Sequence, residues 1–256
     1  MAAHCRALVD AAGPACVAVK PQLACFERLG ALGWAALTDA MEHARGTGLL
    51  VLVDGKRGDV PVTAAAYAQA LVGRTPTPFG DVPGLGADAF TAHPLLGRDA
   101  LEPLLQAARA ASAGVFLVVR TSNPGAGDVQ DLPGPGGEPL WERLAALVAE
   151  LGAPGVGESG LADVGAVTGA TAPQHLPRMR ELMPRAPFLL PGVGAQGGRV
   201  EDLGPAFAPG PAGGLITASR SIATAGERAG GDPAPAARRE AEALRETAWE
   251  LAAEAR

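Results

Sequence analysis

The segment from Val51 to Asp59 combines charged groups at a spacing suited to acid–base chemistry. It reads Val-Leu-Val-Asp54-Gly-Lys56-Arg-Gly-Asp59, so an apolar strand runs directly into an Asp-x-Lys-x-x-Asp motif. Asp54 and Lys56 are two residues apart, and in an extended strand they share one face. A lysine between two carboxylates is held as an ammonium, which can donate a proton beside an anionic substrate group. The alternative is an ordinary salt-bridge cluster at the end of a strand.

A glycine-rich segment near the C-terminal third is suited to binding an anion. It begins at Pro191 and reads Pro-Gly-Val-Gly-Ala-Gln-Gly-Gly. Glycines allow backbone N–H groups to face an anion, although such a segment is also found in plain turns. Arg220 follows the last predicted strand and would add a permanently charged, bidentate clamp. Together the two features indicate a phosphorylated substrate.

Two further predicted strands end in polar side chains. Lys20 lies in Val-Lys-Pro, and Ser122 lies in Thr-Ser-Asn-Pro. A lysine among apolar neighbours indicates a site residue, because burying an unpaired charge is costly. The hydroxyl of Ser122 can bind a polar ring or a carboxylate, although serine also starts turns.

Short apolar runs alternate with longer helical segments along the chain. The predicted strands are Cys16–Lys20, Leu49–Asp54, Ala87–Ala92, Gly114–Thr121, Val164–Ala170, Phe188–Pro191 and Gly214–Ser219. The predicted helices are residues 2–12, Cys25–Ala44, Val62–Val72, Leu95–Ala111, Leu140–Leu151, His175–Met183, Arg199–Phe207 and Ala236–Ala253. The apolar runs are continuous rather than alternating, which is typical of parallel strands covered on both faces.

This order predicts one α/β domain over residues 1–256 with a single parallel sheet, either a closed barrel or a doubly wound layer. A (β/α)8 TIM barrel that lacks its first β-strand would give this order of elements. The chain opens with a helix, and seven strands follow. A gap in a parallel barrel exposes two strand edges, so we expect either a reading frame that begins upstream or another segment in the gap. Active sites lie at the carboxyl ends of barrel strands, where the candidate side chains stand. Two segments, Arg74–Gly86 and Asn123–Pro139, are predicted as long loops.

Composition narrows the classes of function. The chain has 256 residues, of which 48% are hydrophobic, and a net charge of −6. This acidity argues against nucleic acid or an anionic membrane as the main partner. Three cysteines without C-x-x-C spacing and four scattered histidines predict no metal site. With no signal peptide or membrane-spanning run in the sequence, we expect a cytoplasmic protein.

Taken together, these segments resemble the orotidine 5′-phosphate decarboxylase family, in particular its bacterial type 2 branch. The matching segments begin at Val19, Asp54, Thr121, Gly169, Pro191 and Ala218. The resemblance implies a carboxy-lyase that converts orotidine 5′-phosphate to UMP and carbon dioxide in pyrimidine synthesis, without a metal or organic cofactor. It implies that Lys56 donates the proton to C6 of the pyrimidine, that Asp54 lies close to the substrate carboxylate, and that Lys20 contacts the ribose.

The same resemblance implies roles for the remaining candidates. Asp59 and Thr63 would reach into the active site of a neighbouring subunit, so the expected assembly is a homodimer. Ser122 would contact the base. The phosphate would be held by Pro191, Gly194, Gln196, Gly197 and Arg220.

Three segments depart from the family pattern. No strand ends in the family's Gly-Leu/Ile-Asp-Pro motif, and Val-Pro-Val-Thr63 replaces Ile-Gly-x-Thr. His93-Pro-Leu-Leu-Gly lacks the family's tyrosine. These departures leave two alternatives open: a diverged homologue that acts on or binds another nucleotide or sugar phosphate, and a non-enzymatic protein that binds only a nucleotide or a partner chain.

Overall fold

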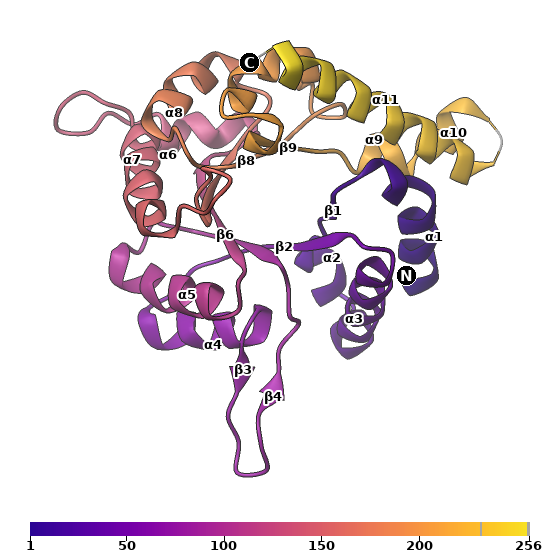
Figure 1. The fold of residues 1–256 in the computed structure, drawn as a ribbon, viewed down its shortest axis with the longest axis horizontal. Coiled ribbons are helices and arrows are strands. Elements are labelled where there is room, and N and C mark those ends of the chain that lie inside the picture. Colours follow the sequence, from indigo (N-terminus) through magenta and orange to yellow (C-terminus); the bar gives the residue numbers. More distant parts are fainter. Residues whose placement is uncertain (231, 255–256) are drawn as a thin grey trace. The chain divides into compact units, whose positions relative to one another are not determined.

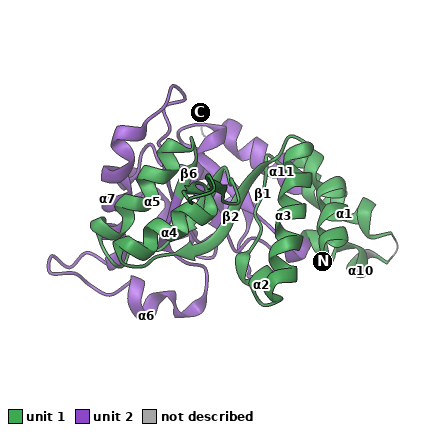
Figure 2. Ribbon diagram, turned by 90° about the horizontal axis from the view of Figure 1, so that it is seen from below, with its two compact units in different colours: residues 1–115, 222–242 green, residues 116–221, 243–256 purple. Residues whose placement is uncertain are grey.

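The computed structural model describes residues 1–230 and 232–254, and the chain divides into two compact units (Figure 2). Unit 1 contains residues 1–115 and 222–242, and unit 2 contains residues 116–221 together with the chain from residue 243 onward. Strand β6 (Gly114–Arg120) and helix α11 (Pro233–Glu254) each contribute residues to both units. The expectation of a single domain stays a prediction.

Unit 1 is built on three parallel strands in the order β1-β2-β5. They are β1 (Ala18–Val19), β2 (Leu50–Arg57) and β5 (Ala89–Ala92). The helices are α1 (Ala2–Ala12), α2 (Leu23–Glu27), α3 (Gly30–Gly46), α4 (Pro61–Leu71), α5 (Arg98–Ala110) and α10 (Ala225–Ala229), with a 3-10 turn η1 (Gly13–Ala15); α9 (Arg220–Ala223) spans the unit boundary. Val51, Val53 and Phe90 are fully buried, as expected for strands covered on both faces. Helices α4 and α5 lie side by side (Figure 1), and α4 contacts β2.

The predicted helix Cys25–Ala44 is wrong in one respect, because the structure divides it into α2 and α3. The chain bends at Gly30, whose φ is +59°, a left-handed conformation that glycine adopts readily. A Cβ at Gly33 would lie 1.9 Å from the Phe26 carbonyl oxygen. The break therefore depends on a close approach of the two helices, and only glycine at position 33 allows it.

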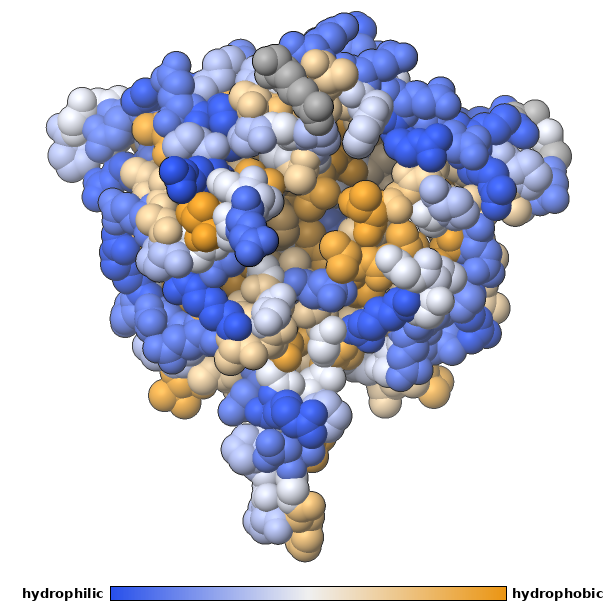
Figure 3. All heavy atoms as spheres, in the orientation of Figure 1, coloured by the Kyte–Doolittle hydropathy of each residue, from blue (hydrophilic) through white to orange (hydrophobic). Residues whose placement is uncertain are grey.

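The predicted loop Arg74–Gly86 is also wrong, because it contains an antiparallel hairpin, β3 (Arg74–Thr75) and β4 (Val82–Pro83). The hairpin extends away from α4 in Figure 1. At its tip, the Thr77 hydroxyl donates to the Gly80 carbonyl (2.6 Å) and accepts from the Phe79 N–H (3.2 Å). Phe79 is fully exposed, and the end of the hairpin carries an apolar spot in Figure 3. Strands of two residues are too short to leave a periodic pattern in the sequence.

Unit 2 is built on strands in the order β6-β7-β8-β9. The last three are β7 (Val164–Thr168), β8 (Phe188–Pro191) and β9 (Gly214–Thr217), and they pair in parallel. The helices are α6 (Gly127–Gln130), α7 (Leu140–Gly152) and α8 (Leu176–Leu182), with 3-10 turns η2 (Pro124–Ala126), η3 (Ala153–Gly155), η4 (Pro173–His175), η5 (Val200–Phe207) and η6 (Pro211–Gly213). Within the described part of the chain, no helix is both long and apolar enough to cross a membrane.

Two expectations for unit 2 need correction. The predicted helix Arg199–Phe207 is a 3-10 helix, and Pro205 within it lacks the N–H that a regular α-helix requires. The predicted loop Asn123–Pro139 contains η2 and α6. The two short helices η2 and α6 are each less than two turns long, so they show no hydrophobic period in the sequence.

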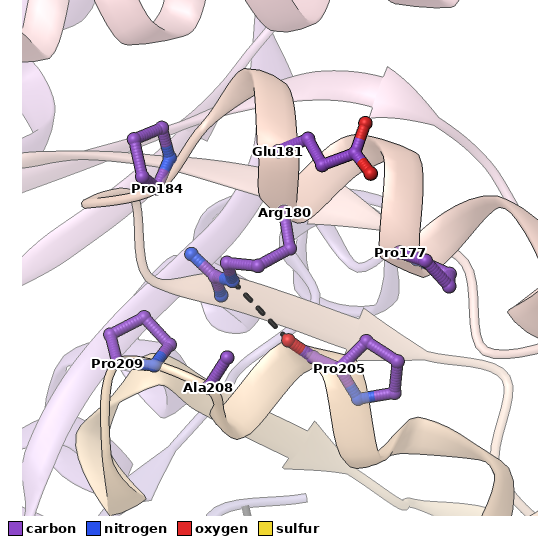
Figure 4. Close-up of a pocket in the computed structure, with 7 residues that line it drawn as sticks. All are labelled: Pro177, Arg180, Glu181, Pro184, Pro205, Ala208 and Pro209. Atoms are coloured by element: carbon purple, nitrogen blue, oxygen red, sulfur yellow. Dashed lines mark hydrogen bonds between the residues drawn. The ribbon is translucent and has the colours of Figure 1, made fainter.

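Arg180 of α8 is a buried cation that joins several elements of unit 2 (Figure 4). Its guanidinium lies 3.7 Å from the centre of the Phe188 ring. It donates to five backbone carbonyls, those of Met183, Ala186, Pro205, Ala206 and Gly213. Burial lowers the pKa of this arginine to about 10. Arg180 thus fastens α8 to η5 and to the segment before β9.

Replacing Arg180 by methionine should destabilise the protein, because five backbone carbonyls, four of them in buried contacts, lose a charged hydrogen-bond donor. We expect the free energy of unfolding to fall by about 3 kcal/mol. Urea denaturation of Arg180→Met measures the change. The control is Arg178→Met on the same helix, whose exposed side chain pairs with Glu142 and Glu181 and should change the free energy of unfolding far less. Equal effects of the two variants would contradict this role of Arg180.

Candidate active site

The carboxylate of Asp54, on β2 in unit 1, lies at the centre of a charged cluster. Oδ1 accepts from Lys56 Nζ (2.7 Å) and from the Thr91 hydroxyl (2.9 Å). Oδ2 accepts from Lys20 Nζ (2.7 Å) and from Gln22 Nε2 (3.2 Å). A carboxylate offers about four acceptor positions, and all of them are used. The structure therefore brings together three of the predicted site residues: Lys20, Asp54 and Lys56.

The electrostatics of the cluster keep Asp54 ionised. Asp54 is buried, with only 5% of the residue exposed to solvent. Burial alone would raise the pKa of this carboxyl, but the Lys20 and Lys56 ammonium groups outweigh burial and lower the pKa to about 2. Two ammonium groups thus share one carboxylate, and the three groups together carry a net positive charge suited to an anionic substrate.

The backbone that carries Asp54 and Lys56 is a β-bulge rather than the regular extended strand expected from the sequence. Val53 pairs with Phe90 and Arg57 pairs with Ala92, so the register shifts between them. Lys56 has a φ of +44°, which is rare for a residue other than glycine. Bulges of this kind redirect side chains and are common beside active sites.

Two residues that bond to Asp54, Thr91 and Gln22, were not predicted as site residues from the sequence. His93, which follows a predicted strand and could contact the substrate at the edge of the site, is half-buried. Burial and the nearby Lys56 ammonium lower the pKa of its imidazole. Thr91 is the one polar side chain of β5, and that interruption of an apolar run was an available signal.

A stronger signal was the scarcity of lysine. The chain contains 21 lysine and arginine residues, and only two of them, Lys20 and Lys56, are lysines. Both bond to the carboxylate of Asp54. Arginine keeps its proton in proteins, whereas lysine can give one up. A chain that uses arginine elsewhere and lysine only at this cluster indicates a need for a proton donor there.

Asp59 and Thr63 lie outside the cluster. The Asp59 carboxylate accepts from the Val60 N–H (2.7 Å), just before α4. Thr63 lies in the first turn of α4, and its side chain makes no hydrogen bond to any residue the structure describes. Over residues 1–230 and 232–254, no three His, Cys, Asp or Glu side chains group as metal ligands.

In unit 2, the glycine-rich loop after β8 contacts the predicted base-binding serine. The Ser122 hydroxyl donates to Gln196 Oε1 (2.6 Å), and the Thr171 hydroxyl donates to the Ser122 carbonyl (2.8 Å). A Cβ at Gly192 would lie 3.0 Å from the Ser122 Cβ, and the φ of +108° at Gly192 also favours glycine. Thr171 was missed as a site residue.

The backbone of this loop is suited to an anion. Gly192, Gly194 and Gly197 all have positive φ values, and the Gly197 N–H donates to the Gly194 carbonyl (2.8 Å), which closes a tight turn. The N–H groups of Ala195 and Gln196 donate to no acceptor within the described part of the chain. Pro191 ends β8, and exposed Arg220 begins the short helix α9 (Arg220–Ala223) after β9.

Comparison with known proteins decides the family. Residues 2–238 match the sequence model of the "Orotidine 5'-phosphate decarboxylase / HUMPS family". The chain belongs to this family. Its relatives include the orotidine 5′-phosphate decarboxylase of Deinococcus radiodurans, 45% identical over 93% of this chain and 81% of the relative. The corresponding protein of Rhodopirellula baltica is 42% identical over 88% of this chain and 73% of the relative.

Solved structures of the family agree. Leishmania donovani OMP decarboxylase is 31% identical, with a TM-score of 0.74, over 97% of this chain and 88% of that one. A Methanocaldococcus jannaschii homologue matches with a TM-score of 0.70 over 96% of this chain and 93% of that one; at 20% identity it supports the fold alone. The predicted α/β barrel class is confirmed. The described residues form seven parallel strands that alternate with helices along the chain, which fits an eight-stranded barrel that lacks one strand.

Proposed function

We propose that the protein decarboxylates orotidine 5′-phosphate to UMP. The observation that carries the proposal is the Lys20–Asp54–Lys56 cluster, in which an ionised, buried carboxylate holds two ammonium groups at 2.7 Å. Family membership and relatives of 42 to 45% identity that bear this activity in their names support the same conclusion.

The reaction requires little beyond this cluster. The bond between C6 and the substrate carboxylate breaks, carbon dioxide leaves, and its electron pair remains on C6. The Lys56 ammonium stabilises the developing negative charge and then transfers a proton from Nζ to C6. Asp54 holds Lys56 in place and stands beside the substrate carboxylate, so loss of carbon dioxide relieves a repulsion between two like charges.

We assign substrate binding to the remaining candidates. The loop of Gly194, Gln196 and Gly197, with Pro191 and Arg220, binds the phosphate. Its glycine turn leaves the N–H groups of Ala195 and Gln196 without an acceptor among the described residues, and Arg220 adds a permanent charge. Ser122 contacts the base and Lys20 the ribose. Binding energy from a phosphate remote from the reacting carbon can contribute to transition-state stabilisation.

Ultraviolet absorbance of the purified chain with orotidine 5′-phosphate tests the proposal. We expect turnover without added metal or cofactor, confirmed by chromatographic detection of UMP. A folded sample that binds the substrate without turnover would favour the diverged homologue, and further nucleotide and sugar phosphates would then be screened. A sample that neither binds nor turns over would overturn the proposal.

We propose further that the protein is a homodimer, that it belongs to the bacterial type 2 branch of the family, and that it is located in the cytoplasm. Asp59 and Thr63 stand apart from the cluster of their own unit, which supports a role in a neighbouring site. Exposed apolar side chains that could form a dimer surface follow β2 and β5, namely Val60, Val62, Leu95 and Leu96.

The phosphorylated substrate and product do not cross membranes freely, which supports a location in the cytoplasm, where nucleotides are made. Light scattering over a concentration series measures the assembly, and a monomer at all concentrations would contradict it.

A further inference from the structure

The bulge in β2 leaves part of its backbone without partners on the neighbouring strand. Between the pairs Val53–Phe90 and Arg57–Ala92, three residues of β2 stand opposite one residue of β5. The three residues are Asp54, Gly55 and Lys56, and the one residue is Thr91. A regular ladder cannot satisfy the extra N–H groups of a bulge, and leaving them unpaired in the interior is costly.

The Thr91 hydroxyl takes the place of the missing ladder. Its oxygen accepts from the N–H of Gly55 (3.1 Å) and from the N–H of Lys56 (2.8 Å). The same hydroxyl donates to Asp54 Oδ1 (2.9 Å). A hydroxyl has one donor and two acceptor positions, so all three are used. Thr91 is fully buried, so solvent cannot replace these bonds.

These bonds act on the two groups that carry the proposed chemistry. Lys56 keeps a left-handed backbone conformation, with φ of +44°, which normally persists only when its surroundings enforce it. Its N–H is bound to Thr91, and its Nζ lies 2.7 Å from the Asp54 oxygen that Thr91 also binds. The Thr91 hydroxyl therefore orients both the backbone of Lys56 and the carboxylate of Asp54.

We propose that Thr91 is a positioning residue that holds Lys56 and Asp54 in the geometry needed for proton transfer. The proposal rests on the decarboxylase function proposed above. Thr91 itself contacts no substrate; it acts through the backbone of Lys56 and the carboxylate of Asp54.

Thr91→Val tests the proposal, because valine keeps the shape of threonine and lacks the hydroxyl. We expect kcat to fall about 100-fold, the size expected when a reacting group is misplaced by about 1 Å. KM should change much less, because Thr91 is not a binding residue. Thr91→Ser keeps the hydroxyl and should restore most of kcat.

Thr168→Val is the matched control. Thr168 is also fully buried in a strand, but its hydroxyl has no hydrogen-bond partner among residues 1–230 and 232–254. The same substitution there removes no bond, so kcat should stay at the wild-type value. Thr91→Cys replaces the hydroxyl with a weak donor and acceptor and should give an intermediate kcat; it takes over as the test where the valine variant does not fold.

A spectroscopic measurement tests Thr91 independently of activity. With 13C at lysine Cε, the protein gives two lysine signals, assigned with Lys56→Ala. We expect Thr91→Val to shift the Lys56 signal, which shares Oδ1 with Thr91, more than the Lys20 signal, which binds Oδ2. Unchanged kcat and an unchanged Lys56 signal in Thr91→Val would overturn the proposal. Absence of turnover in the wild type would instead count against the proposed function, and the lysine signals would still test Thr91.

Discussion

Lys56→Ala should abolish decarboxylation while the protein still binds UMP. Proton transfer by a positioned side chain contributes about 10²- to 10⁴-fold to a rate, and a preorganised charge contributes about 10²- to 10³-fold more. Because Lys56 supplies both, we expect kcat to fall by at least about 10⁴-fold. Absorbance assays measure the rate, and calorimetric titration with UMP measures binding.

Two further variants separate the roles of Lys56. Lys56→Arg keeps a positive charge beside Asp54 but cannot release a proton near neutral pH, so it should remain almost inactive. Arg28→Ala removes an exposed cation of unit 1 that has no ion pair among the described residues, and it should keep full activity. Equal losses of turnover and of UMP binding in Lys56→Ala would mean that the lysine is structural rather than catalytic.

Sequence reasoning located this cluster because charge and strand pattern coincide there. Lys20 and Asp54 each follow an apolar run, and the carboxyl ends of parallel strands meet at one edge of a sheet. The parallel strands of both units were predicted to within a few residues for the same reason, since buried parallel strands are continuous apolar runs. The grouping of Lys20, Asp54 and Lys56 could therefore be anticipated from the order of residues alone.

Features that depend on a single close contact leave no periodic pattern in the sequence. The division between α2 and α3 depends on the approach of Gly33 to the Phe26 carbonyl, which no periodic pattern marks. Thr91 was missed because its role exists only where the β2 bulge leaves two N–H groups unpaired. An expectation of a regular strand at Asp54–Lys56 hides the need for such a partner.

Asp54→Asn should destabilise the protein strongly, because it leaves two partly buried ammonium groups without their carboxylate. Lys20 and Lys56 side chains are 18% and 35% exposed, and each lies 2.7 Å from Asp54. Removing one partner of a buried ion pair costs about 3–5 kcal/mol of unfolding free energy. Asp39→Asn is the control, since Asp39 pairs with Arg6 at the surface and should contribute less than about 1 kcal/mol.

The dependence of stability on pH tests whether the charge of Asp54 causes the destabilisation expected in Asp54→Asn. Its pKa is about 2 in the folded protein, against an ordinary value of 3.8. A carboxyl whose pKa is lower in the folded state stabilises that state fully above pH 3.8, and this contribution is lost as pH falls from 3.8 towards 2. The shift corresponds to about 2 kcal/mol. The stability difference between wild type and Asp54→Asn should therefore shrink by about that amount between pH 6 and pH 2.

Urea denaturation of both proteins across this range measures the difference directly, and Asp39→Asn corrects for general acid effects at the surface. Asparagine resembles a protonated aspartate in shape and charge, so wild type and variant should approach each other once Asp54 is protonated. A difference that stays constant from pH 6 to pH 2 would mean that asparagine disturbs the packing around Thr91 and Gln22 rather than the charge balance. The packing of the Asp54 side chain, rather than its charge beside the ammonium groups of Lys20 and Lys56, would then account for its contribution to the free energy of unfolding.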